Sequence, residues 1–209
     1  MFVDRPEAGR RLAEALAHLD NEPVVVLAIP RGGVEIGAEV ARRWSWPLDV
    51  VIPRKIGAPG NPELALGAIA PGVRVLSDEL IRRLRVSAEY LEREIEEQER
   101  EIERRARAFR RGRPATDLHG RIAVVVDDGV ATGSTAIASL RWARAQGAAR
   151  VLLAVPVAPG EAIPMLEKEA DEVACLEVPE PFYAVGQWYE RFAQTTDEEV
   201  IELLEAAAR

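Results

Sequence analysis

The sequence predicts an α/β fold in which helices flank a mostly parallel sheet. Two apolar runs, 23–29 and 122–126, are unbroken and rich in β-branched residues, which is the pattern of strands buried on both faces. Segments of helical periodicity alternate with such runs, as in strand–helix–strand units with right-handed crossovers. With 209 residues, 48% of them hydrophobic, the chain can bury one sizeable core, so we expect a single domain with its core over about 22–160.

The N-terminal part predicts helices that alternate with strands. Apolar side chains recur at helical spacing in 7–19 and again in 34–44, and each segment precedes an apolar run. We therefore expect a strand over 23–29 and a second strand over 48–52. These elements form the first strand–helix–strand unit of the sheet.

The segment 54–72 contains four glycines and three prolines. These residues interrupt regular structure, so the segment cannot hold one element throughout. We expect a mainly flexible loop here, followed by a short strand over 73–76.

A long charged helical insertion is predicted over about 77–113. Ser77 and the acids after it are typical of a helix start, and glutamates alternate with arginines as on a solvated helix face. An apolar stripe at helical spacing follows. The stripe predicts either packing of the insertion on its own domain or a contact with a partner protein or in a homodimer. Its members are Leu84, Ala88, Leu91, Ile95, Gln98, Ile102, Ala106 and Phe109.

The C-terminal part returns to alternation and ends in a segment richer in aromatic residues. The aromatic segment, 179–209, is expected to form a hood that ends in a helix from about 197 to 208. The elements before it are a strand over 121–126, a helix over 135–146, a strand over 150–155, a helix over 161–170 and a strand over 172–178.

Composition excludes several functional classes. The formal charge of -8 disfavours a nucleic-acid groove, because affinity for the phosphate backbone comes from clustered Lys and Arg. A lone Cys175 predicts neither an internal disulfide nor a structural zinc site. The apolar runs are too short to cross a bilayer and the first residues do not resemble a signal peptide. We therefore expect a cytoplasmic protein that binds neither nucleic acid nor membrane.

The most informative turn follows the apolar run 122–126. Asp127 and Asp128 end a buried strand, where unpaired carboxylates would cost several kcal/mol unless a cation or a polyol compensates them. The next residues, 131–135, place small side chains and three hydroxyls at a helix start. Gly133 permits close backbone approach there, and the positive helix end favours an anion. An ordinary helix cap accounts equally well for this turn taken alone.

Other phosphate motifs do not fit this turn. A P-loop requires a lysine after its last glycine, where this chain has Ser134. Neither this turn nor the one at 30–33 has the glycine spacing of a dinucleotide fingerprint. Receiver-like and phosphatase sites also use paired acids, but they do not account for the hydroxyl-rich turn.

The segment 124–135 resembles the phosphoribosyl pyrophosphate (PRPP) signature of type I phosphoribosyltransferases. The resemblance implies that the two acids hold the ribose hydroxyls and that the hydroxyl-rich turn holds the 5′-phosphate. The turn at 30–33 is similar to the family's pyrophosphate loop, which often carries a cis bond, here between Pro30 and Arg31. The pair Arg54 and Lys55 is similar to the one that opens the family's flexible catalytic loop, whose closure excludes water.

The resemblance implies transfer of the ribose 5-phosphate group of PRPP to a nitrogenous base, a purine or similar heterocycle, with release of pyrophosphate. Magnesium is the implied cofactor, and PRPP itself would hold most of it. The two acids would either not contact the ion or add a secondary contact. The implied catalytic residues are Arg31, Arg54, Lys55, Asp127 and Asp128. The implied PRPP-binding residues are Pro30, Arg31, Gly32, Gly33, Asp127, Asp128, Gly129, Val130, Ala131, Thr132, Gly133, Ser134 and Thr135.

The acceptor base is left open by the sequence. Several purine-salvage relatives have an acid at the position of Ala131, and an alanine there is more similar to the adenine-type branch. Candidates for contacting a base are Phe182, Tyr183, Trp188, Tyr189 and, from the loop, Glu63; core packing is the alternative for the four aromatic residues. Two other functions stay open: a PRPP sensor without efficient turnover, and a nucleotide-dependent hydrolase.

Overall fold

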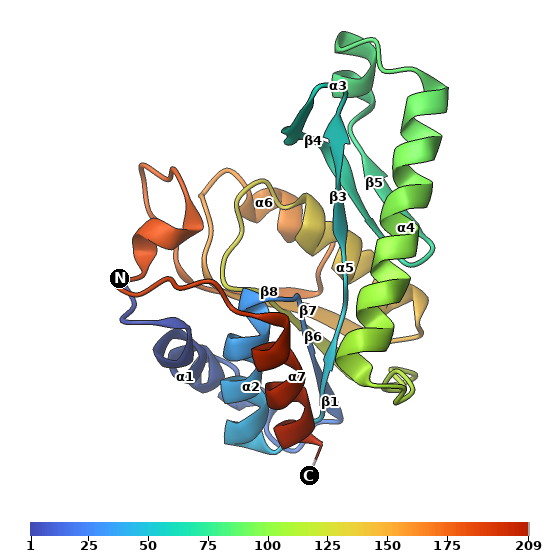
Figure 1. Ribbon diagram of the computed structural model, residues 1–209. Helices are drawn as coiled ribbons and strands as arrows, with labels where there is room; N and C mark the ends of the chain where they lie inside the picture. Colours follow the sequence, from blue (N-terminus) through green and yellow to red (C-terminus); the bar gives the residue numbers. More distant parts are fainter. Residues whose placement is uncertain (209) are drawn as a thin grey trace.

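The computed structural model describes residues 1–208 and contains two sheets (Figure 1). Five parallel strands form the larger sheet in the order β2-β1-β6-β7-β8, and three antiparallel strands form the smaller one in the order β3-β4-β5. The predicted α/β fold with a mostly parallel sheet is confirmed. The strands are β1 (Val24–Ala28), β2 (Leu48–Val50), β3 (Arg54–Ala58), β4 (Asn61–Ala70), β5 (Val73–Leu76), β6 (Ile122–Val126), β7 (Arg150–Val157) and β8 (Glu172–Glu177).

Helices cover both faces of the parallel sheet, which explains why its central strands read as unbroken apolar runs. Alternate residues of β1 and β6 pack with α5 on one face and with α1 and α2 on the other. The α-helices are α1 (Arg5–Ala15), α2 (Gly32–Trp44), α3 (Asp78–Arg83), α4 (Ala88–Arg110), α5 (Ser134–Ala145), α6 (Ile163–Leu166) and α7 (Asp197–Ala207), and the short 3-10 helices are η1 (Ala17–Leu19) and η2 (Val185–Trp188).

The strand order shows where successive strands stop adding on one side of β1 and start adding on the other. The chain passes from β1 to its neighbour β2 on one side, whereas β6, β7 and β8 continue on the other side of β1. In such a sheet, ligands bind beyond the carboxyl ends of the two strands at which the order reverses. Here those strands are β1 and β6.

The expectation of a loop over 54–72 is wrong, because β3 and β4 form an antiparallel hairpin there. Two of the glycines that predict interruption, Gly57 and Gly67, instead allow close packing of backbones. A Cβ atom on Gly67 would lie 2.1 Å from the carbonyl oxygen of Val75 in β5. In Figure 1 this hairpin and α4 stand beside the parallel sheet and extend away from it.

The helical insertion consists of α3 and α4, and its apolar stripe packs on its own domain. Ser77 caps α3 as expected, accepting a hydrogen bond from the backbone nitrogen of Leu80. Ile95, Ile102 and Phe109 are buried in a cluster with residues of β3, β4 and α7. The stripe therefore holds α4 against the hairpin and the C-terminal helix.

Two further differences from the sequence concern the C-terminal part. The helix expected over 161–170 is only one turn, Ile163–Leu166; Pro164 lies in its first turn, where the missing N–H group costs nothing, and so fixes where the helix begins. The C-terminal helix α7 is present, and its capping box is formed by Thr196 and Glu199. Among residues 1–208, no helix has the length and apolarity needed to cross a membrane.

We expect Ile102→Ala to lower the free energy of unfolding by about 2–5 kcal/mol, because it leaves a cavity between α4 and its neighbours. Leu84→Ala is the matched control: Leu84 belongs to the same stripe but is 40% exposed, so its loss should stay within about 0.5 kcal/mol. Denaturant unfolding of both variants measures the difference. Equal effects would contradict the packing role of the stripe.

Candidate active site

The turns after β1 and β6 leave the sheet side by side. The two strands pair in register, Ala28 opposite Val126, and the backbone nitrogen of Ile29 donates a hydrogen bond to the carbonyl oxygen of Val126 at 2.8 Å. The turn 30–33 and the turn 127–133 therefore meet at the switch point. They form the floor of a cleft of about 610 Å³. The β3–β4 hairpin and α4 form another side of this cleft.

Most residues predicted for the site line this one cleft. Of the predicted PRPP-binding residues, Gly33, Val130 and Ser134 are not part of its lining: Gly33 and Val130 are buried beneath it, and Ser134 begins α5. The predicted residues that line the cleft are Pro30, Arg31, Gly32, Arg54, Lys55, Glu63, Asp127, Asp128, Gly129, Ala131, Thr132, Gly133 and Thr135.

The turn after β6 combines two chemically different halves. In the first, the backbone nitrogen of Asp128 donates to Oδ1 of Asp127 at 2.8 Å. In the second, Gly133 is the N-cap of α5 with φ of 84°, and within residues 1–208 no side chain caps the helix. The first N–H groups of α5 are therefore open to an anion. The hydroxyls of Thr132 and Ser134 lie next to them, 3.4 Å apart.

Burial perturbs both acids. It raises the pKa of Asp127 well above its usual range, and the neighbouring charge of Asp128 adds to the effect. Burial also raises the pKa of Asp128, whereas the guanidinium of Arg5 opposes that rise. Adjacent carboxylates resist simultaneous ionisation unless a ligand or a cation compensates them. A pair of acids perturbed in this way inside a cleft is a candidate binding site.

The turn after β1 contains the expected cis bond between Pro30 and Arg31. Its glycines are required by close packing: a Cβ atom on Gly33 would lie 2.7 Å from the carbonyl oxygen of Val126. The Arg31 side chain is about one-third exposed, and its Nη1 lies 3.7 Å from Oδ1 of Asp197 at the start of α7. The turn therefore presents backbone and one cation to the cleft.

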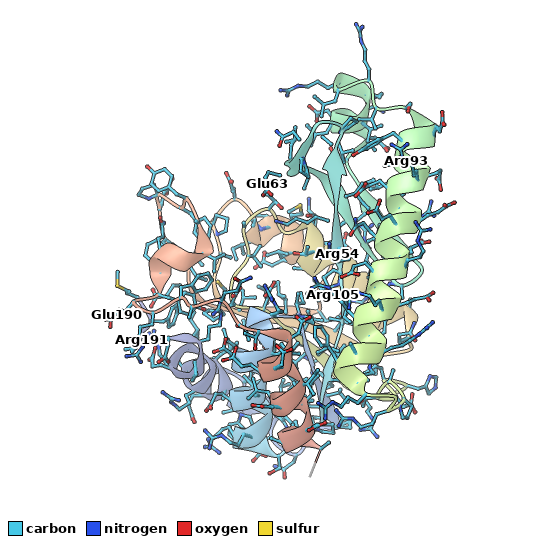
Figure 2. The ribbon with its side chains drawn as sticks, in the orientation of Figure 1. Arg54, Glu63, Arg93, Arg105, Glu190 and Arg191 are labelled. Carbon is cyan, nitrogen blue, oxygen red and sulfur yellow. The ribbon has the colours of Figure 1, made fainter. Side chains whose placement is uncertain are left out.

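The hairpin supplies two cations without carboxylate partners. Among residues 1–208, neither Arg54 nor Lys55 has a carboxylate oxygen within 4.0 Å. Burial lowers the pKa of Arg54, and the charge of Arg105 adds to this effect; a guanidinium nevertheless stays protonated. Figure 2 shows Arg54 and Glu63 on the strands that wall the cleft. Unpaired cations facing a cleft are suited to a polyanion.

Gln98 and Arg5 are site residues that the sequence did not single out for function. Arg54 donates from Nε to Oε1 of Gln98 at 2.8 Å, and Gln98 donates in turn to Glu94 at 3.0 Å. Arg5 donates from Nε to Oδ2 of Asp128 at 2.8 Å. Each could have been noticed, because Gln98 interrupts an apolar stripe and Arg5 shares the buried face of α1 with Leu12.

The four predicted aromatic residues lie outside the lining of the cleft. Phe182 and Trp188 pack against the core beside α1 and α2, and Tyr183 is 82% exposed. Tyr189 is buried and donates from its hydroxyl to the carbonyl oxygen of Asp128 at 2.6 Å. Val185 is the hood residue that lines the cleft. Contact between a base and these aromatic residues stays a prediction.

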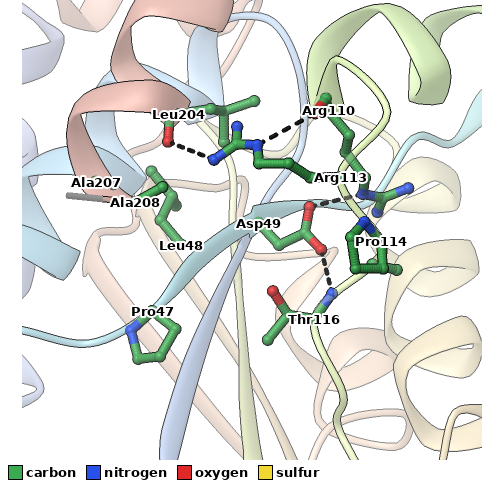
Figure 3. Close-up of a pocket in the computed structure, with 11 residues that line it drawn as sticks. Pro47, Leu48, Asp49, Arg110, Arg113, Pro114, Thr116, Leu204, Ala207 and Ala208 are labelled. Carbon is green, nitrogen blue, oxygen red and sulfur yellow. Dashed lines mark hydrogen bonds and ion pairs between the residues drawn. The ribbon is translucent and has the colours of Figure 1, made fainter.

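Another cavity, of about 370 Å³, lies where β2 meets the end of α4 (Figure 3). Asp49 accepts hydrogen bonds there from Arg110 at 2.9 Å and from the backbone nitrogen of Thr116 at 2.7 Å. Arg113 donates to the carbonyl oxygens of Arg110 and Leu204. These polar groups pair with one another, so they hold the segment after α4 in place, whereas Arg54 and Lys55 in the first cleft have no carboxylate partner among residues 1–208.

Comparison with known proteins identifies the family. A family model for the phosphoribosyl transferase domain matches residues 3–191, which is most of the chain. The chain belongs to the phosphoribosyl transferase domain family. The resemblance found in the acid pair and its hydroxyl-rich turn is therefore confirmed at the level of the family.

Relatives agree with the family match. A Mycobacterium tuberculosis protein, whose name assigns it provisionally to the phosphoribosyl transferases, is 50% identical over 210 residues, covering 100% of this chain and 47% of the relative. The chain thus spans about half the length of the curated relatives it matches. The crystal structure of TT1426 from Thermus thermophilus is 49% identical with a TM-score of 0.82, covering 98% of this chain and 97% of that one.

A more distant structure shares the fold alone. The AQ2163 protein of Aquifex aeolicus is 16% identical with a TM-score of 0.53, covering 87% of this chain and 78% of that one. The phosphoribosyl transferase fold is therefore retained where little sequence identity remains.

We expect Asp127→Asn to stabilise the ligand-free protein at neutral pH. The native pKa of Asp127 is raised above its unfolded value, so the stability contributed by the protonated form is full below about pH 4 and is lost as pH rises through the native pKa. Asparagine keeps Oδ1 as an acceptor and removes that loss, so the free energy of unfolding at pH 7 should rise by about 1–2 kcal/mol.

Chemical denaturation between pH 4 and pH 8 measures this effect. Asp20→Asn is the control, because Asp20 is exposed and its substitution should leave the pH profile unchanged. An Asp127→Asn variant that follows the wild-type pH profile would show that the carboxylate does not destabilise the fold.

Proposed function

We propose that the protein transfers the ribose 5-phosphate group of PRPP to a nitrogenous base and releases pyrophosphate. The observation that carries the proposal is the meeting of three separate segments in one cleft. Acids, a helix start with free N–H groups and unpaired cations match a sugar, a phosphate and a pyrophosphate respectively. The family match supports a transferase. The dependence of the protein on PRPP, the identity of the acceptor base and a role in nucleotide salvage belong to the proposal.

Each segment would have its own part in binding. Asp127 and Asp128 would accept hydrogen bonds from the ribose hydroxyls, and the first turn of α5 would bind the 5′-phosphate through its N–H groups. The turn 30–33 would clasp the pyrophosphate with backbone N–H groups. Arg54 and Lys55 stand across the cleft, where they can neutralise the charge that develops on the leaving pyrophosphate.

Magnesium fits this donor set. The ion usually takes one or two carboxylates together with waters and substrate phosphate oxygens, and the cleft offers Asp127 and Asp128 beside the proposed phosphate positions. Most of its ligands would come from PRPP. When bound, magnesium would neutralise pyrophosphate charge and orient the sugar.

Positioning accounts for most of the proposed catalysis. The cleft would hold the anomeric carbon between the base and the departing pyrophosphate, which converts a bimolecular reaction into one with fixed partners. The acceptor base is a purine or similar heterocycle in this proposal, with Glu63 on β4 as a candidate to accept from its amine. A homodimer and a cytoplasmic location complete the proposal.

The test is a panel of nitrogenous bases incubated with PRPP and magnesium, with pyrophosphate release measured for the wild type and for Asp128→Asn. We expect release with at least one base and its loss in the variant. Binding of PRPP without release for any base would favour a sensor, and release without any base would favour a hydrolase. A protein that does not bind PRPP would contradict the proposal.

Lys55→Ala should lower kcat by about 100-fold, because it removes a cation that acts on the leaving group in the transition state. Arg83→Ala is the control, since Arg83 is an exposed cation on α3 and lies outside the lining of the cleft. Steady-state kinetics of both variants measure the difference. Equal rates for Lys55→Ala and the wild type would remove Lys55 from the mechanism.

A further inference from the structure

We propose that Arg5, in the first turn of α1, is a positioning residue of the sugar site: it fixes one carboxylate oxygen of Asp128 and leaves the other to accept from a ribose hydroxyl. The inference rests on the proposed function. It assigns a role in binding to a segment that lies more than a hundred residues from the acid pair in sequence.

Arg5 is held in a single orientation by four groups from three parts of the chain. Its side chain is 8% exposed, and its Nε lies 2.8 Å from Oδ2 of Asp128. Nη1 donates to the carbonyl oxygen of Ala193 at 2.6 Å and lies 3.5 Å from Oε1 of Glu35. The guanidinium carbon stands 4.0 Å from the centre of the Phe192 ring. A buried arginine with this many partners has little freedom to move.

The contact with Asp128 fixes the plane of its carboxylate. A carboxylate otherwise rotates over a broad range about its last torsion. Oδ2 is enclosed by Arg5 on one side and by the turn after β1 on the other, because a Cβ atom on Gly32 would lie 2.1 Å from Oδ2. The second oxygen, Oδ1, is therefore the one available to the cleft that Asp128 lines.

The backbone of Asp128 is fixed as well. The Tyr189 hydroxyl donates to its carbonyl oxygen at 2.6 Å, and Glu35, which contacts Arg5, also accepts a hydrogen bond from Thr195. Besides Asp128, the acids Asp127 and Glu35 stand near Arg5, which is the one buried cation among residues 1–208. Arg5 therefore also offsets negative charge where the sugar is proposed to bind. The N-terminal helix and the segment 189–195 thus jointly hold the acceptor of the sugar site.

Binding of magnesium–PRPP to Arg5→Gln, measured by isothermal titration calorimetry, tests the inference. We expect a dissociation constant about 10-fold to 100-fold above wild type, the range for losing a hydrogen bond to a charged group. Arg5→Lys should recover part of the loss, because lysine keeps the charge but not the fork of donors. With a base that the enzyme accepts as substrate, KM for PRPP should rise while kcat changes by less than about threefold. The reason is that the sugar contact already exists before the transition state.

Arg11→Gln is the matched control. Arg11 lies on the same helix, and it too forms an ion pair, with Glu177 at 3.1 Å, and lies over an aromatic ring, that of Phe2. Its substitution should leave the dissociation constant within about twofold of wild type. Equal dissociation constants for Arg5→Gln and wild type, or equal losses in Arg5→Gln and Arg11→Gln, would overturn the inference.

A double-mutant cycle with Asp128→Asn separates this inference from the proposed function. Without ligand, the unfolding equilibrium constant of the double variant should differ by about fivefold or more from the value expected if the two substitutions acted independently. Agreement with that expected value would show that Arg5 does not hold Asp128. A wild-type protein that fails to bind magnesium–PRPP would overturn the proposed function and the sugar-site role together. Wild-type binding that Arg5→Gln leaves unchanged would overturn the inference alone.

Discussion

The in-register parallel pairing of β1 and β6 is the constraint on which the rest of the structure depends. Because Ala28 lies opposite Val126, the two turns that follow these strands are forced to leave the sheet together. A shift of the register would separate the acid pair from the turn 30–33 and would remove the floor of the cleft. The apolar residues that bury both faces of these strands therefore also fix the geometry of the site.

The acid pair shows a conflict between stability and binding. Burial raises the pKa of both carboxyl groups in the cleft, and the charge of Asp128 raises that of Asp127 further, so the pair destabilises the ligand-free fold at neutral pH. Arg5 offsets part of this cost, because its buried guanidinium forms an ion pair with Asp128. A ligand that supplies hydroxyl donors or positive charge would compensate the remaining negative charge of the acid pair.

The sequence predicts those parts of the fold and site that local chemistry determines. Continuous apolar runs indicate the central strands, and the resemblance of 124–135 to the PRPP signature indicates the family. The hairpin was missed because Gly67 interrupts a pattern in sequence yet permits close strand approach in space. Arg5 and Gln98 were missed as site residues because their partners lie far away in the chain, although a polar residue on an apolar face was a visible signal in each case.

The central claim is that PRPP binds across the switch point, with sugar, phosphate and pyrophosphate each on its own segment. A crystal structure of the protein with magnesium and PRPP tests this most directly. The account predicts the 5′-phosphate at the first turn of α5, the ribose against Asp127 and Asp128, and the pyrophosphate between the turn 30–33 and Lys55. PRPP bound elsewhere, for example in the cavity beside Asp49, or a cleft left empty at saturating PRPP, would contradict it.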